Sequence, residues 1–106
     1  MKRIAYAPEV LDDLTELIET LFNEGYLYTY EDAEQYVQDI LRHFRKNIEN
    51  YPCKTAPAFF EKFGSGLKYM PYKRNQRTIW YIIFAEHPEL FHVVHITNNH
   101  VAAQYF

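Results

Sequence analysis

The chain is poor in the residues that crosslink, interrupt or anchor a fold. Its 106 residues include one cysteine, three glycines and five prolines. A single cysteine cannot form an internal disulfide, which argues against a secreted disulfide scaffold. No apolar run approaches the roughly 18 residues that a membrane-spanning helix needs, and the first residues do not read as a signal peptide. We therefore expect one domain, residues 1–106, in a reducing cytoplasm and without membrane attachment.

Several motifs that carry enzyme chemistry are also missing. Gly64 and Gly66 lack the further glycines and the lysine of a phosphate-binding loop, so nucleotide hydrolysis is not expected. Ser65 has no helix directly after it and cannot form a nucleophile elbow. His92 and His95 are an odd number of residues apart and should point to opposite faces of a strand, unless a bulge separates them. We expect neither a metal nor a cofactor.

Charge is distributed unevenly along the chain. Residues 1–50 carry a balance of −6 and residues 54–77 a balance of +5, within a net charge of −3. A basic surface of this kind could meet a polyanion although the whole chain is acidic. The ordinary alternative is a solvated surface with uneven charge.

The first half of the chain predicts one strand and two helices. Residues 4–7 suit an edge strand, and Pro8 suits the first turn of a helix. Apolar residues then recur at helical spacing until residues 23–25 end the helix. Thr29 has the character of a helix N-cap, and the apolar stripe of this second helix extends to Ile48. The short connection between the helices predicts an antiparallel pair.

The second half of the chain predicts three strands. Residues 67–73 form a strand in which Pro71 requires an edge position or a bulge. Residues 78–85 are β-branched and aromatic, which is typical of a central strand buried on both faces. Residues 90–97 form the last strand, and two asparagines stop it. The fold class is therefore α+β: an N-terminal strand, an antiparallel two-helix hairpin, then a three-stranded antiparallel meander.

A basic and aromatic surface on this meander is the strongest candidate site. Antiparallel pairing brings Arg77, at the start of the central strand, beside residues 97–99 at the end of the next one. RNA cleavage without a metal needs a base for the 2′-hydroxyl, an acid for the leaving oxygen and a cation for the phosphorane charge. Such groups gather here. The candidate substrate-binding residues are Lys68, Tyr72, Lys73, Arg74, Asn98 and Asn99.

The candidate catalytic residues follow from the same chemistry. Arg77 could stabilise the phosphorane, and His95 or His100 could transfer the proton. Tyr72 or Tyr105 could stack on a base or act as the acid. The alternative is that these residues only end the strands and cap the sheet.

These elements and residues resemble the RelE/ParE superfamily of bacterial toxins, which includes plasmid stabilisation proteins. The likeness consists of the element order, the stretch YKRNQRTIWY at residues 72–81, and a closing strand that runs into a histidine and ends near a tyrosine. At the level of residues it covers about residues 67–106. In that family, a partner antitoxin holds the small toxin inactive. RelE-like members cut mRNA on the ribosome, whereas ParE-like members poison DNA gyrase without being nucleases.

The resemblance implies roles for residues of this chain. Arg77 looks like the arginine at the start of the R-x-x-Y core of RelE-like members, with Trp80 in the place of the tyrosine. His95 or His100 resembles their late-strand histidine, and Tyr105 resembles their carboxyl-terminal tyrosine. The resemblance thus implies a toxin that inhibits translation by ribosome-dependent, metal-independent mRNA cleavage, with an antitoxin, the ribosome and mRNA as partners.

Two departures from the family keep alternatives open. The net charge of −3 contrasts with the strongly basic nuclease members, and residues 97–99 stand where a late-strand arginine is common. The alternatives are a non-enzymatic ParE-like inhibitor of DNA gyrase, and a catalytically inactive module bound to an antitoxin.

Overall fold

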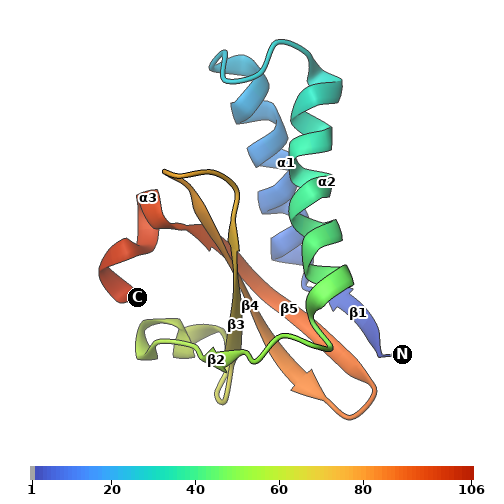
Figure 1. Cartoon of the computed structure of the whole chain (residues 1–106), viewed down its shortest axis with the longest axis vertical. Coiled ribbons are helices and arrows are strands. Elements are labelled where there is room, and N and C mark those ends of the chain that lie inside the picture. Colours follow the sequence, from blue (N-terminus) through green and yellow to red (C-terminus); the bar gives the residue numbers. More distant parts are fainter. Residues whose placement is uncertain (1) are drawn as a thin grey trace.

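A five-stranded mixed sheet carries a pair of long helices on one face (Figure 1). The computed structural model describes residues 2–106. No helix in this range is long and apolar enough to cross a membrane. The elements in chain order are β1 (Arg3–Tyr6), α1 (Pro8–Asn23), α2 (Tyr30–Asn47), β2 (Lys54–Thr55), the 3-10 helix η1 (Ala58–Phe63), β3 (Lys68–Lys73), β4 (Ile79–His87), β5 (Leu90–Asn98), α3 (Asn99–Ala102) and the 3-10 turn η2 (Ala103–Tyr105).

Both long helices begin where the sequence predicts. Pro8 occupies the first position of α1, where a backbone N–H is not needed. The Thr29 hydroxyl caps α2 by accepting a hydrogen bond from the backbone N of Asp32 at 3.0 Å. Gly25 adopts a φ of 74° just after α1, which a residue with a side chain would rarely do. The two helices then run antiparallel and extend beyond the sheet (Figure 1).

The sheet confirms the α+β class but is larger than the sequence predicts. Its strand order is β1-β5-β4-β3-β2, with β1 parallel to β5 and every other pair antiparallel. The predicted edge strand is confirmed, because β1 lies at one edge of the sheet. The prediction of a three-stranded antiparallel meander is incomplete, because β1 pairs parallel to β5 and β2 adds a fifth strand at the other edge. Pro71 lies in β3 beyond the two positions that pair with β2, so its missing N–H leaves no strand pairing unmade on that side.

The sheet is buried on both faces by different elements. Between the sheet and α1 and α2 lies the larger core, which includes Phe44, Trp80 and Phe84. On the opposite face, η1 and the carboxyl-terminal segment form a smaller core around Phe60 and Ile83. Alternate residues of β4 enter the two cores, which confirms the prediction of a central strand buried on both faces.

A bulge in β5 corrects one prediction about side-chain direction. Phe84 of β4 lies opposite Val93, whereas the preceding Ile83 lies opposite His95, so Val94 is the extra residue. Because of this extra residue, His95 faces the same side of the sheet as Ile83, and His92 faces the same side as Ala85. Ile83 and Ala85 are two positions apart on β4, so His92 and His95 face the same side of the sheet. Their expected placement on opposite faces is wrong, because it assumed a regular strand.

Candidate functional site

The ends of β4 and β5 are joined by side chains rather than by strand pairing alone. The Asn99 side chain accepts a hydrogen bond from the backbone N of Ile79 at 2.9 Å and donates one to the carbonyl oxygen of Arg77, also at 2.9 Å. Arg77 therefore lies beside the end of β5, as antiparallel pairing predicts. We call Arg77, Thr78, Asn98, Asn99 and His100 the strand-end site.

His100 is held at one of its two ring nitrogens. Its Nε2 lies 3.0 Å from the Thr78 hydroxyl oxygen, and the residue is otherwise exposed. The Asn98 side chain accepts hydrogen bonds from the backbone N of His100 and of Val101, which fixes the start of α3. In the tautomer that donates from Nε2 to Thr78, the Nδ1 lone pair is free to accept a proton.

The turn between β3 and β4 presents Arg77 to solvent. The Asn75 side chain accepts hydrogen bonds from the backbone N of Arg77 at 2.9 Å and of Thr78 at 3.0 Å. Within residues 2–106, the Arg77 guanidinium has no carboxylate partner. Sequence analysis did not single out Asn75 and Thr78 for this role, although an asparagine between two strands is an ordinary signal for such a turn.

Two of the candidate catalytic residues lie away from the strand-end site. His95 lies on β5 opposite Ile83, three pairing positions from Asn98 at the strand end, whereas His100 lies in α3. Its ring stacks on Phe63, with centroids 4.4 Å apart, and burial lowers its pKa below the ordinary value of 6.5. Tyr105 packs in the smaller core, with its ring stacked on Phe59 at 3.6 Å. Both rings serve packing in this arrangement.

The two lysines of the candidate site lie at opposite ends of β3. Lys68 pairs with the carboxylate of Glu86 at an Nζ–Oε1 distance of 3.0 Å, and Lys2 contacts the same carboxylate at 2.6 Å. Hydrogen bonds from these two lysines lower the pKa of Glu86. Lys73 is exposed and lies opposite Ile79, at the end of the sheet that carries the strand-end site. Only Lys73 of this pair is therefore placed to assist Arg77.

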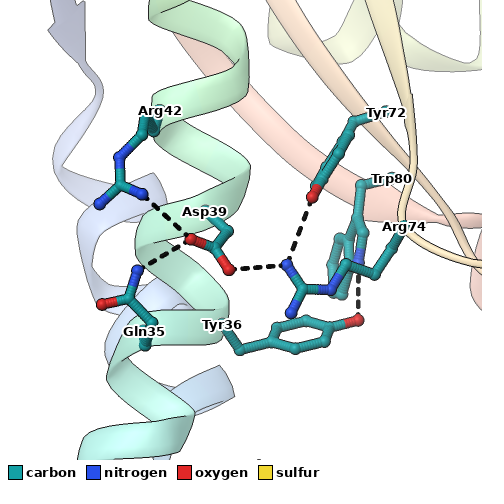
Figure 2. Close-up of polar contacts among 7 residues, drawn as sticks. All are labelled: Gln35, Tyr36, Asp39, Arg42, Tyr72, Arg74 and Trp80. Atoms are coloured by element: carbon teal, nitrogen blue, oxygen red, sulfur yellow. Dashed lines mark hydrogen bonds and ion pairs between the residues drawn. The ribbon is translucent and has the colours of Figure 1, made fainter.

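Tyr72 and Arg74 face α2 instead of solvent (Figure 2). Arg74 Nη1 lies 2.9 Å from Asp39 Oδ2 and 3.3 Å from the Tyr72 hydroxyl, and its guanidinium lies 4.3 Å from the centroid of the Tyr36 ring. The Tyr36 hydroxyl in turn accepts a hydrogen bond from Trp80 Nε1 at 3.1 Å. This helix–sheet polar cluster joins α2 to β3 and β4. The polar groups of Tyr72 and Arg74 already interact with each other and with α2, which argues against the predicted substrate-binding role of these two residues.

The ion pair of this cluster gives a pH-dependent prediction. We expect Asp39→Asn to lower the free energy of unfolding by up to about 1 kcal/mol at pH 7. The hydrogen bond from Arg74 holds the pKa of Asp39 below its ordinary value of 3.8. The stabilisation is therefore complete above the unfolded-state pKa and is lost as the pH falls through the lowered folded-state pKa. Urea denaturation of both chains at pH 7 and at about pH 2 measures this.

A matched control distinguishes the effect of the Asp39–Arg74 ion pair from that of other charges on α2. Arg42 approaches the same carboxylate at 3.4 Å but is 64% exposed, so Arg42→Gln should cost less than Asp39→Asn. A deficit of Asp39→Asn that persists in full at about pH 2 would mean that the ionised pair is not its cause.

Neither metal coordination nor similarity to known proteins assigns a function to the site. Among residues 2–106, no group of three or more His, Cys, Asp or Glu side chains is arranged to hold a metal ion. No family model matches the chain, and no curated protein or solved structure is significantly similar to it. The interpretation of the site therefore depends on its own residues and geometry.

Proposed function

We propose that the chain is the toxin of a type II toxin–antitoxin system and that its strand-end site cleaves mRNA. One observation carries this proposal: the exposed imidazole of His100 and the exposed guanidinium of Arg77, which has no carboxylate partner among residues 2–106, lie at neighbouring strand ends that Asn99 holds together. A RelE/ParE-like arrangement is supported by the consecutive antiparallel pairing of β3, β4 and β5 after an antiparallel helix pair.

His100, Arg77 and Lys73 each have one chemical role in the proposed reaction. His100 Nδ1 accepts the proton of the ribose 2′-hydroxyl, and the 2′-oxygen attacks the adjacent phosphorus. The bond from phosphorus to the 5′-oxygen breaks, and that oxygen takes a proton from water. The hydroxide that remains takes the proton from His100, which restores water and the neutral imidazole. The products are a 2′,3′-cyclic phosphate and a new 5′-hydroxyl. Arg77 stabilises the added negative charge on the phosphorane, and Lys73 binds a neighbouring phosphate.

The proposed partners follow from the location of the site. Lys73 at the end of β3 and Arg77 in the β3–β4 turn lie at an exposed end of the sheet, where a ribosome-bound mRNA could reach both residues. An antitoxin that covers this end would hold the toxin inactive.

A second candidate function is supported by the residues that the site lacks. His95 and Tyr105 are packed in the smaller core, and Lys68 and Arg74 are neutralised by carboxylates. Together with a net charge of −3, this favours a protein that acts by binding. The two forms of this alternative are a ParE-like inhibitor of DNA gyrase and an inactive module bound to an antitoxin.

An induction experiment separates these functions. The chain is expressed without a partner in a bacterial host, and protein and DNA synthesis are pulse-labelled in parallel. We expect protein synthesis to fall first, and Arg77→Ala to prevent the fall because the phosphorane charge loses its cation. Arg45→Ala is the matched control, because Arg45 is an exposed arginine on α2.

The other outcomes point elsewhere. If DNA synthesis falls first, or if the Arg77→Ala chain remains toxic, the protein acts by binding in the manner of a gyrase inhibitor. If the wild-type chain causes no growth defect, the inactive module is the better account.

A further inference from the structure

A groove of about 590 Å³ lies where β1 ends and α1 begins. It is separate from the strand-end site, because none of the residues that line it belongs to that site. Three elements or their flanks contribute to the lining. The lining residues are Ala7, Glu9, Asp13, Phe63, His92, Val94 and His95.

Two backbone irregularities create the groove. The last strand pairing of β1 is between Tyr6 and Val93, after which Pro8 turns the chain into α1. Within residues 2–106, no strand pairs with this edge of β5 beyond Val93. The bulge at Val94 then turns both histidines toward the same side. Bulges often redirect side chains next to binding sites, so the groove is more than a gap between elements.

The aromatic rings of Phe63 and His95 form the floor of the groove. His95 and Phe63 stack at 4.4 Å with an interplanar angle of 14°. Burial lowers the pKa of His95, Lys62 lowers it further, and Asp13 opposes both effects. The Lys62 ammonium lies 4.1 Å from the Phe59 ring centroid and 5.4 Å from that of Phe63.

One wall of the groove is acidic. Glu9 and Asp13 lie one helical turn apart on α1, and within residues 2–106 neither carboxylate has an ion-pair partner. The charge of the wider surface has the same sign. Residues 4–41 contain ten Asp and Glu and no Lys, Arg or His. This surface repels nucleic acid and attracts a cationic partner.

We propose that the groove binds an arginine side chain from a basic segment of another protein. A guanidinium is planar, so it can lie against the aromatic floor formed by Phe63 and His95 while it donates paired hydrogen bonds to a carboxylate. Glu9 and Asp13 supply the carboxylates, and the acidic surface of α1 steers the segment toward them. The inference is independent of RNA cleavage, because it uses none of the residues of the strand-end site.

Fluorescence anisotropy with a labelled peptide tests the proposal. The probe is the peptide SRSRSRS, and its counterpart carries citrulline, which is isosteric and neutral, at each arginine position. We expect the arginine peptide to bind and the citrulline peptide to bind at least about tenfold more weakly. Asp13→Asn should weaken binding of the arginine peptide by about tenfold, and Phe63→Leu by severalfold, with thermal unfolding unchanged for the exposed Asp13.

The control variant removes one negative charge, as Asp13→Asn does, but at a position far from the groove. Glu24→Gln removes one carboxylate from the end of α1, 11 positions and roughly 16 Å beyond Asp13. It should leave binding within about twofold, because only screened long-range attraction is lost. Equal losses in Glu24→Gln and Asp13→Asn would overturn the proposal, as would equal binding of the citrulline peptide. Binding of labelled oligouridine RNA that depends on Asp13 would overturn it in favour of a nucleic-acid site.

Discussion

Replacing His100 by alanine should slow mRNA cleavage by about 100-fold to 10,000-fold. In the proposed reaction, His100 Nδ1 is the proton acceptor for the 2′-hydroxyl, and Thr78 fixes the ring through Nε2 at 3.0 Å. Alanine removes the acceptor but leaves Arg77 and the Asn99 connection in place. The measurement is the cleavage rate of an end-labelled mRNA on purified ribosomes, with identification of the 2′,3′-cyclic phosphate end.

Two further variants test this result, His87→Ala as a control and Thr78→Ala as a test of how the ring is held. His87→Ala removes an exposed histidine from the far end of β4 and should leave the rate unchanged. Thr78→Ala keeps the imidazole but frees its ring, so we expect a loss smaller than that of His100→Ala. Retention of the full rate by His100→Ala would remove this residue from the mechanism. Products without a cyclic phosphate end would contradict attack by the 2′-oxygen.

The largest loss of stability is expected from Phe44→Ala, at about 3–5 kcal/mol. Phe44 has no exposed surface and packs edge-to-face against Phe84, with ring centroids 5.4 Å apart. It anchors α2 on the central strand, so truncation leaves a cavity between the two layers of the fold. Such a loss is a large share of the roughly 5–15 kcal/mol that stabilises a domain. Urea denaturation at constant m-value measures it.

Phe22→Ala is the matched control for this substitution. Phe22 is 39% exposed near the end of α1, and its ring centroid lies 5.9 Å from that of Tyr30. Its truncation removes far less buried area, so we expect a loss below about 1 kcal/mol. Similar losses in the two variants would show that Phe44 is not a particular anchor of α2.

Local signals predicted the two long helices and the strands β1, β3, β4 and β5. Pro8 and Thr29 act on backbone groups within a few residues, so the helix starts follow from the sequence alone. The apolar run at residues 78–85 likewise predicts burial on both faces without knowledge of what covers each face. Contacts over long separations were not predictable in this way. Asp39 pairs with a residue 35 positions away, and neither residue alone indicates the other.

The candidate site was predictable only where it follows from strand pairing. Arg77 lies beside residues 97–99 because the start of one strand lies next to the end of the following antiparallel strand. The placement of His95 depends instead on one extra residue in β5, which periodicity cannot reveal. Tyr105 is the last residue of η2, and its stacking on Phe59 depends on how the segment folds back over the sheet.

The parallel pairing of β1 with β5 determines the order in which the protein can assemble during its own synthesis. Arg3 lies opposite Leu90, 87 positions later, so the first strand stays unpaired while most of the chain is being translated. The two long helices depend on contacts close in sequence and can form much earlier. Thr78 and His100 come together only after His100 has left the ribosome exit tunnel. A growing chain therefore carries its helical hairpin long before it carries an assembled strand-end site.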